Sequence, residues 1–425
     1  MGILRYPPYL QWEVCSECNH KCVHCYNYWR ASNISVEKCA DYDLIAEKII
    51  ERRPLYVAIT GGEPLLVFPH IKPAIDKLIN SGISVSISTN GTLITKDIAE
   101  YLSQRKIDLV ISLPSINEQI CDMVTCGHDV VKKLKKVLPL LKQYSINTNI
   151  NIVINKLNLS TLYDTLVAVG GMGFVTRVGV AQRPINASKE YSKYEINKTE
   201  FNTIVQTCLK AKREHNIDLD FSVCLPDCAF DDEQAIKELG KGDCLGGTLA
   251  YAICANGDVK ACQCDTMVYG NILKDSWASL YQEMISWRNS SMIPELCKSC
   301  SIVNRCRGGC RVESYARDND YSKPPTFFNS DKHFDVDTKV AAGKGYKSSE
   351  CFILSDNVVF LKDENCYRVS VGIIPTFLSF ELVDWLKCHK SFSYQELADS
   401  CEIAPSDLNL AIELMIKNLI IKQTH

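Results

Sequence analysis

Short β-branched runs alternate with helical stretches over the first 185 residues of the chain. The runs that predict strands are 9–14, 55–60, 84–88, 107–112, 148–154 and 176–181. Apolar positions recur at helical spacing between them, for example over 41–52, 70–80, 95–105 and 129–144. Strands that alternate with helices favour a parallel sheet. Six such units predict an α/β fold, a partial (β/α)6 barrel, whose active site would lie at the carboxyl ends of the strands.

The pattern changes twice further along the chain. Cysteine and glycine crowd residues 244–310, which is typical of a region held together by metal ligands rather than by a large apolar core. After residue 351, two β-rich runs precede helical stretches over 377–387, 393–401 and 406–418, and a last strand. Ser393 and Glu396 have capping-box spacing, and Ser406 is a good N-cap. We therefore expect three domains: 1–235, 236–350 and a small winged-helix-like domain over 351–425.

Composition and charge exclude several classes of protein. The chain has 425 residues, of which 46% are hydrophobic and 23% charged, with a net charge of −3. That charge gives no electrostatic reason to bind nucleic acid or an anionic membrane. No apolar run approaches the roughly 18 residues of a spanning helix, and the N-terminus lacks a signal-peptide pattern. We expect a cytoplasmic protein.

The 22 cysteines are the unusual feature of the composition. Disulfide-rich proteins are usually short and secreted, whereas closely spaced cysteines in a cytosolic chain favour metal binding. Cys18, Cys22 and Cys25 form a CxxxCxxC motif. Three thiolates at this spacing can hold three irons of a [4Fe–4S] cube and leave the fourth iron open to a ligand. The alternative is a zinc knuckle, with a fourth ligand from His20, His24 or Cys15.

Two polar motifs follow consecutive predicted strands. Thr60-Gly61-Gly62-Glu63-Pro64 follows the second strand; its glycines allow a ligand to approach the backbone, and its carboxylate can take an ammonium group. Ser88-Thr89-Asn90-Gly91 follows the third strand, and its short polar side chains suit ribose hydroxyls or a carboxylate. Each motif alone is typical of a simple turn. Together with the cysteines, they mark one end of the barrel as a binding site.

These three motifs resemble those of the radical S-adenosylmethionine (SAM) superfamily, over residues 9 to about 185. The resemblance implies that SAM chelates the open iron, and that a 5′-deoxyadenosyl radical made by its reductive cleavage abstracts hydrogen from substrate. The residue before the last cysteine is often aromatic in this family, and here it is His24. The implied SAM-binding residues are Tyr26, Gly61, Gly62, Glu63, Pro64, Ser88, Asn90 and Ser112. No catalytic base or quenching residue can be chosen from the sequence.

The second cysteine region resembles the SPASM extension of radical SAM peptide-modifying enzymes. Six of that extension's seven cysteines match in spacing, and a zinc ribbon is the alternative. The resemblance implies two auxiliary [4Fe–4S] clusters, three clusters in all. Auxiliary cluster I would take Cys244, Cys262 and Cys310, and auxiliary cluster II would take Cys297, Cys300 and Cys306.

The match departs from the SPASM pattern at the fourth ligand of each auxiliary cluster. Cys254 and Cys264 are candidates for cluster I, which could also have an open position. The seventh cysteine usually follows the sixth by about twenty residues, and none stands there. Cluster II could instead use Cys351, Asp331, His333 or Asp335. The other cysteines are interpreted as small buried apolar residues: Cys39, Cys121, Cys126, Cys208, Cys224, Cys228, Cys366, Cys388 and Cys401.

Residues 351–425 resemble, in pattern only, the peptide-recognition domains of ribosomal-peptide maturases, which bind a leader peptide along a sheet edge. A structural cap or a dimerisation element is the alternative. The resemblance implies a maturase that crosslinks a ribosomally made precursor peptide, with flavodoxin or ferredoxin as reductant. An enzyme like the anaerobic sulfatase maturases and a peptide epimerase are the other candidates. Intact SAM motifs argue against a non-catalytic binding module.

Overall fold

The computed structural model describes residues 7–31, 41–222, 224–239, 244–300, 302–331, 349–355, 358–362, 367–370, 376–378, 380–400, 408–409, 411–412, 415–416 and 420–424. The chain divides into two compact units. The larger unit comprises Leu10–Arg52 and Val57–Asp335. The other, here called the C-terminal unit, comprises Val336–His425 together with Met1–Tyr9 and Arg53–Tyr56.

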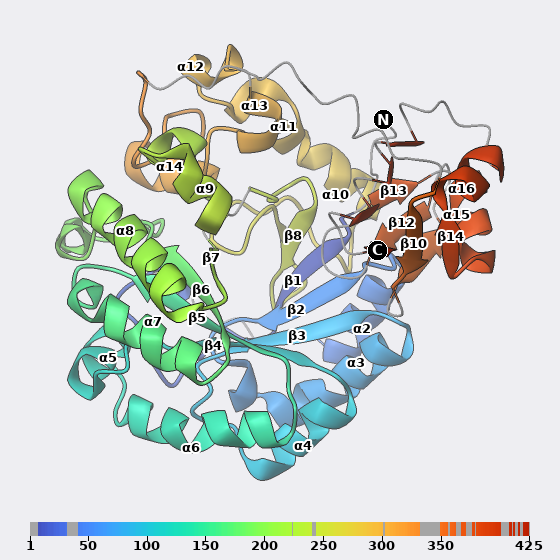
Figure 1. Ribbon diagram of the computed structural model, residues 1–425. Coiled ribbons are helices and arrows are strands. Elements are labelled where there is room, and N and C mark those ends of the chain that lie inside the picture. Colours follow the sequence, from blue (N-terminus) through green and yellow to red (C-terminus); the bar gives the residue numbers. More distant parts are fainter. Residues whose placement is uncertain are drawn as a thin grey trace. The chain divides into compact units, whose positions relative to one another are not determined.

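A nine-stranded sheet organises the larger unit (Figure 1), in the order β7-β6-β5-β4-β3-β2-β1-β8-β9. The first seven strands are β1 Tyr9–Glu13, β2 Tyr56–Thr60, β3 Ser84–Thr89, β4 Asp108–Ser112, β5 Thr148–Ile154, β6 Val175–Val180 and β7 Leu219–Phe221. Neighbouring strands from β3 to β7 run parallel. The predicted α/β partial barrel with a parallel sheet is confirmed, and β7 is a further strand that the pattern did not indicate.

The helices of the barrel connect the strands, and Figure 1 shows α4, α6 and α7 side by side along one side of the sheet. Their bounds are α1 Tyr26–Ala31, α2 Tyr42–Ile50, α3 Phe68–Asn80, α4 Lys96–Gln104, α5 Glu118–Thr125, α6 Val130–Gln143, α7 Leu162–Gly171, α8 Lys198–His215 and α9 Glu233–Leu239. Polar side chains fix where several of them begin. Asp41 accepts from the first amides of α2, and Asn197 and Glu200 form a capping box at α8.

The cysteine-rich region continues the barrel's sheet rather than forming a sheet of its own. Its elements are β8 Ala250–Ile253, β9 Val259–Lys260, α10 Trp277–Glu283, α11 Ile285–Arg288, α12 Glu295–Lys298, α13 Val303–Cys306 and α14 Arg311–Asp318. β8 lies next to β1, and β8 and β9 form an antiparallel pair. The remaining elements are short helices separated by loops, as expected of a region that depends on ligands for its order.

A buried ion pair joins this hairpin to the first strand of the barrel. Lys260 on β9 and Glu13 on β1 are each 3% exposed, and the Lys260 Nζ lies 3.1 Å from the Glu13 Oε2. The Lys260 ammonium also donates to the Gln263 carbonyl, and the Cys254 thiol lies 3.5 Å from the same Glu13 oxygen. Two charges withdrawn from water must satisfy each other, so these strands are held in one arrangement.

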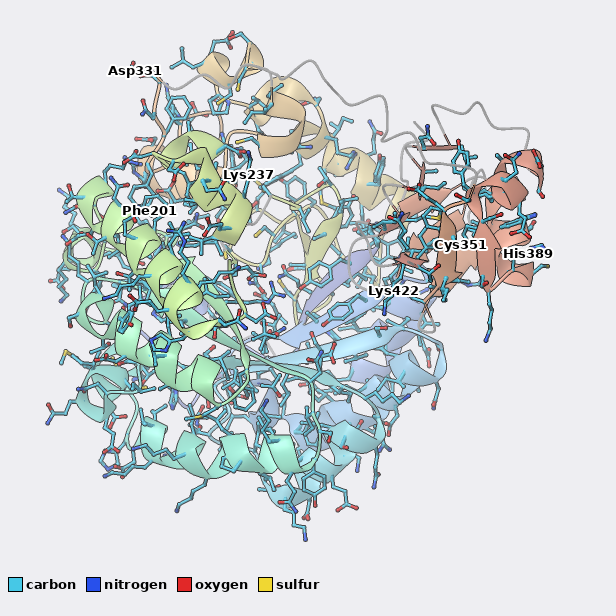
Figure 2. All side chains as sticks on the ribbon, in the orientation of Figure 1. Phe201, Lys237, Asp331, Cys351, His389 and Lys422 are labelled. Atoms are coloured by element: carbon cyan, nitrogen blue, oxygen red, sulfur yellow. The ribbon has the colours of Figure 1, made fainter. Side chains whose placement is uncertain are left out.

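The C-terminal unit contains two small sheets, of order β14-β10-β15 and β11-β12-β13. Its elements are β10 Cys351–Leu354, β11 Val359–Lys362, β12 Tyr367–Ser370, β13 Thr376–Leu378, α15 Phe380–Cys388, β14 Ser391–Ser393, α16 Tyr394–Ser400 and β15 Ile421–Thr424. Phe352, Leu386, Phe392 and Leu397 belong to its apolar core. Figure 2 labels Cys351, His389 and Lys422 in this unit.

The sequence predicted this unit in outline. Ser393 and Glu396 form the expected capping box, since the Ser393 amide donates to the Glu396 carboxylate at 2.7 Å and the Glu396 amide donates back at 3.2 Å. The helix expected from residue 377 was placed too early, because 376–378 pair with β12 as β13 and α15 begins at Phe380. Ser406 lies outside the described residues. Among the helices that the structure describes, none is long and apolar enough to cross a membrane.

Candidate functional site

The loop between β1 and α1 carries the first cysteine motif and is fixed by its own backbone. The Lys21 and Val23 amides donate to the carbonyls of Thr125 and Val124, at 3.0 and 2.9 Å, so the loop lies against the end of α5. The Asn27 amide side chain donates to the Ser16 carbonyl at 2.8 Å. This loop therefore has a defined path between the carboxyl end of β1 and α1.

Cys18, Cys22 and Cys25 lie near one another in that loop. Burial raises the pKa of Cys18 to about 11, and negative charge on Cys25 raises it further. Burial also raises the pKa of Cys22, with Cys25 and Cys18 as the next causes. Thiols in such surroundings release their protons most readily to a bound cation. Three cysteine sulfurs fit the donor set of a [4Fe–4S] cube with one iron left open.

The arrangement suits a single zinc ion less well. Within the described ranges, no three His, Cys, Asp or Glu side chains gather tightly enough to hold one metal ion. A cube does not need such convergence, because each thiolate binds a different iron. Burial lowers the pKa of His24 to about 4, and the Cys15 thiol contacts the Glu63 carbonyl at 3.4 Å. Cys15 and His24 are accounted for by packing next to the loop.

Gly61 and Gly62 are required by the segment that leads to Cys18. A Cβ on Gly61 would lie 2.4 Å from the Cys15 carbonyl oxygen, and a Cβ on Gly62 would lie 1.9 Å from that of Glu17. The amides of Gly62 and Glu63 donate to these same two carbonyls, each at 2.7 Å. The glycines thus allow the end of β2 and the cysteine loop to pack backbone against backbone.

The Glu63 carboxylate faces inward and is 1% exposed. It accepts from the Thr89 hydroxyl at 2.6 Å, the Asn90 amide at 2.8 Å and the Leu65 amide at 3.0 Å. The expectation that this side chain is directed at an ammonium group is not matched, because these donors already occupy both oxygens. Glu63 instead ties the end of β2 to the end of β3, and Pro64 begins the short 3-10 helix that follows.

The residues after β3 are linked to the cysteine loop by amide side chains. Asn90 donates to the Asn19 side-chain carbonyl at 2.7 Å, and Asn19 donates to the Thr92 hydroxyl at 3.1 Å. Ser88 lies on β3, and Ser112 is exposed at the end of β4. Tyr26 is the first residue of α1. The predicted SAM-binding residues therefore lie at the ends of β2, β3 and β4 and at the start of α1.

Five cysteines come together in the first auxiliary group. Burial raises the pKa of Cys310, and negative charge on Cys244 and Cys262 raises it further. The Cys224 thiol donates a hydrogen bond to the Cys244 sulfur, which lowers the pKa of Cys244. The Cys264 thiol donates in the same way to the Cys262 sulfur. This donor set fits an iron–sulfur cluster, and it contains a cysteine, Cys224, that the sequence interpretation had set aside.

The second auxiliary group contains Cys297, Cys300 and Cys306. Burial raises the pKa of Cys297 to about 11, and charges on Cys306, Cys228 and Cys300 contribute in the same direction. Cys297 and Cys306 are each 8% exposed. Again the donor set is one of thiols from short helices and turns, and again it contains a cysteine, Cys228, that the sequence interpretation had set aside.

A buried arginine lies between the two auxiliary groups. Arg311 is 4% exposed, and its guanidinium donates to backbone carbonyls that include those of Met292 and Tyr321. Burial lowers the pKa of Arg311, whereas charges on cysteines of both groups raise it. Arg311 is therefore positioned to offset negative charge at both sites.

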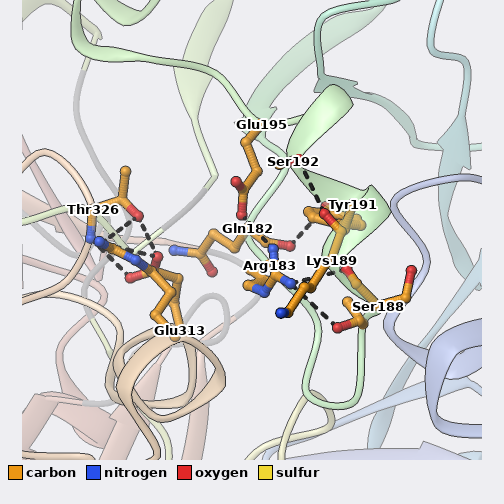
Figure 3. Close-up of polar contacts among 11 residues, drawn as sticks. Gln182, Arg183, Ser188, Lys189, Tyr191, Ser192, Glu195, Glu313 and Thr326 are labelled. Carbon is orange, nitrogen blue, oxygen red and sulfur yellow. Dashed lines mark hydrogen bonds and ion pairs between the residues drawn. The ribbon is translucent and has the colours of Figure 1, made fainter.

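A pocket of about 150 Å³ opens beyond the carboxyl end of β6. Its polar lining includes Gln182, Arg183, Glu195 and Glu313, and Cys224 of the first auxiliary group also lines it. Arg183 pairs with Glu195 at 3.0 Å, and Glu313 accepts from the Thr326 amide at 2.9 Å. Figure 3 shows the Gln182 side chain between the Glu313–Thr326 pair and Arg183. The pocket thus connects the barrel end with the cysteine-rich region.

Comparison with known proteins identifies the barrel. Residues 12–168 match the family model of the Radical SAM superfamily. The chain belongs to this superfamily. It is 26% identical over 324 residues to the mycofactocin maturase MftC of Mycobacterium tuberculosis (strain CDC 1551 / Oshkosh), covering 73% of this chain and 79% of that protein.

Two solved structures extend the likeness of this radical SAM chain beyond the barrel. One is anSMEcpe with bound AdoMet and Cp18Cys peptide, with a TM-score of 0.61, 19% identity, and coverage of 75% of this chain and 92% of that one. The other is Streptococcus suis SuiB bound to precursor peptide SuiA, with a TM-score of 0.60, 19% identity, and coverage of 77% and 76%. The fold after the barrel resembles theirs.

The remaining candidate ligands of this radical SAM enzyme lie in different surroundings. Cys254 contacts Glu13 rather than another cysteine among the printed bonds, and it stays a candidate for auxiliary cluster I by sequence only. Cys351 is exposed at the start of β10, and Asp331 is exposed at the end of the described part of the larger unit (Figure 2). His333 and Asp335, like Cys39, Cys366 and Cys401, fall outside the described residues.

Proposed function

We propose that this radical SAM enzyme modifies a ribosomally made precursor peptide. Its relatives support this, because MftC is named as a maturase and SuiB is described with a bound precursor peptide. When bound, SAM and a [4Fe–4S] cluster at Cys18, Cys22 and Cys25 supply a 5′-deoxyadenosyl radical that abstracts hydrogen. The chain's own residues hold these groups, position the peptide and exclude water.

The observation that carries the proposal is the pocket beyond β6. It lies where barrel enzymes bind their substrates, at the carboxyl ends of the strands. Arg183, Glu195 and Glu313 offer charged groups, and Pro226 and Phe327 offer apolar surface. A peptide has both kinds of group, with carbonyls and amides along its backbone. The volume of about 150 Å³ suits one or two side chains rather than a whole folded partner.

Cluster content is the next part of the proposal. Cys244, Cys262 and Cys310 would hold auxiliary cluster I, and Cys297, Cys300 and Cys306 would hold auxiliary cluster II. Anaerobically reconstituted protein should then contain about twelve irons, and a variant with Cys18, Cys22 and Cys25 replaced by Ala about eight. Wild-type protein with about four irons and bound zinc would instead make the second region a zinc domain.

The C-terminal unit is proposed to capture the leader part of the peptide. Each of its sheets has three strands, so β14 and β15 are the outer strands of one, and β11 and β13 of the other. An extended leader would pair with one of these edges through backbone hydrogen bonds, while side-chain pockets supply selectivity. Ordering a flexible peptide costs free energy, so micromolar affinity is expected.

The bond made is proposed to be an intrapeptide crosslink. Anaerobic co-expression with a peptide encoded beside the gene would test this by mass spectrometry. A crosslink removes two hydrogen atoms, about 2 Da, whereas an epimerase working in deuterated water adds about 1 Da per site. The Cys18, Cys22 and Cys25 triple variant is the control and should leave the peptide unchanged. If a sulfatase-type cysteine or serine were oxidised instead, the maturase of folded enzymes would be the better assignment.

A further inference from the structure

Two cysteine pairs of identical spacing pack against each other in the larger unit. One is Cys224-Leu-Pro-Asp-Cys228, which follows β7, and the other is Cys306-Arg-Gly-Gly-Cys310, which precedes α14. A Cβ on Gly309 would lie 2.8 Å from the Pro226 Cδ and 3.0 Å from its nitrogen. The middle of each loop therefore lies directly on the middle of the other.

The two loops run in opposite senses, so that their ends pair. At one end, charge on Cys310 raises the pKa of Cys224, whose thiol donates to Cys244. At the other end, the amide of Asp227, the residue before Cys228, donates to the Cys306 sulfur at 3.4 Å. Cys224 thus lies with the first auxiliary group, and Cys228 lies with the second.

Cys228 also occupies the place where a downstream ligand would be expected. A seventh cysteine is expected about twenty residues after Cys310 by the resemblance, that is, near residue 330. Asn329 stands there, and its backbone amide donates to the Cys228 sulfur at 3.4 Å. Cys228 is 9% exposed, and charge on Cys300 is felt at its thiol. Amide hydrogen bonds to sulfur are a usual feature of cluster-binding thiolates.

We propose that Cys228 is the fourth protein ligand of auxiliary cluster II, alongside Cys297, Cys300 and Cys306. It replaces a cysteine that the chain lacks downstream, and it comes from the loop whose other end, Cys224, reaches auxiliary cluster I. The proposal rests on the proposed function only in that cluster II must exist. Its donor set is four thiolates from two loops that contact each other directly.

The test is the iron content of full-length protein reconstituted without oxygen. Cys228→Ala should lose at least one of the about twelve irons per chain and change the electron paramagnetic resonance (EPR) signal of one auxiliary cluster. Cys208→Ala is the matched control. Cys208 is also a buried cysteine, but it lies on α8 and only burial perturbs its thiol. It should keep full iron content and unchanged spectra.

Cys228→Ser separates a ligand from a packing residue. A serine oxygen can still bind iron, so a ligand predicts more iron in the Ser variant than in the Ala variant. A buried apolar thiol predicts the opposite order, because an unpaired hydroxyl is harder to bury than a methyl group. Circular dichroism of both variants shows whether a loss of iron follows from unfolding.

Three results overturn the proposal or its basis. If Cys228→Ala keeps all iron and the wild-type EPR signals, Cys228 is not a ligand. If iron is lost from Cys351→Ala but not from Cys228→Ala, the ligand is Cys351. If the Cys297, Cys300 and Cys306 triple Ala variant keeps the wild-type iron content, cluster II does not exist, and the proposed cluster set fails rather than the assignment of Cys228.

Discussion

Replacing Lys260 by Met should strongly destabilise the larger unit, because it removes the cationic partner of the buried Glu13. The pair is 3.1 Å apart, with both side chains 3% exposed. Two unit charges at that distance attract by about 5 kcal/mol at an effective dielectric constant of about 20. Withdrawing each charge from water costs several kcal/mol, so the pair as a whole contributes little, while losing one partner costs about 3–5 kcal/mol.

Urea unfolding followed by tryptophan fluorescence would measure this loss, with Trp12 buried next to Glu13 as a reporter. The double variant Glu13→Leu/Lys260→Met removes both charges and should recover most of the stability. Lys135→Met is the control, since Lys135 pairs with Glu118 at 3.0 Å but is 62% exposed. It should cost less than about 1 kcal/mol.

Two results would refute this reasoning. If Lys260→Met costs no more than Lys135→Met, solvent screens the buried pair as it screens an exposed one. If the double variant is as unstable as Lys260→Met alone, the loss comes from packing of the long side chains and not from an uncompensated carboxylate.

Three further predictions concern the cluster sites and the C-terminal unit. Gly62→Ala should lose about four irons and SAM cleavage, because its Cβ would meet the Glu17 carbonyl; Gly171→Ala, with no atom within 4 Å of the added Cβ, is the control, and equal iron in both would contradict the packing argument. Arg311→Gln should lower the reduction potentials of both auxiliary clusters by about 60 mV, equivalent to about 1.4 kcal/mol for one electron, in an EPR redox titration; unchanged potentials would mean that its charge is screened. Removing residues 352–425 should keep SAM cleavage and weaken peptide binding at least tenfold, about 1.4 kcal/mol, by fluorescence anisotropy of a labelled peptide; unchanged affinity would make the C-terminal unit a structural cap.

Much of the barrel was predictable because local patterns decide it. The six predicted strands agree with β1 to β6 within one residue at each end, since each is a short β-branched run bounded by polar turns. The SAM motifs were predictable for the same reason: each occupies a few consecutive residues at a strand end. The structure adds which atoms of these motifs are already engaged, as for the carboxylate of Glu63.

The roles of Cys224 and Cys228 were not predictable from spacing. They lie sixteen or more residues before Cys244 in the sequence and belong to no recognised interval. Only the contact between Pro226 and Gly309 brings them to the other cysteines. The strand β7 was missed because three residues are too few for a periodic signal, and its pairing with β6 is a tertiary event.

The position of the β8–β9 hairpin in the sheet has a consequence for how the protein behaves when iron is scarce. An open barrel leaves the outer side of β1 with amides and carbonyls that can pair with another chain. Here β8 covers that side, and β8 precedes Cys254 and Cys262 in a segment whose order depends on metal. Chains synthesised without iron would uncover β1, and iron-starved cells should therefore accumulate them as aggregates rather than as inactive enzyme.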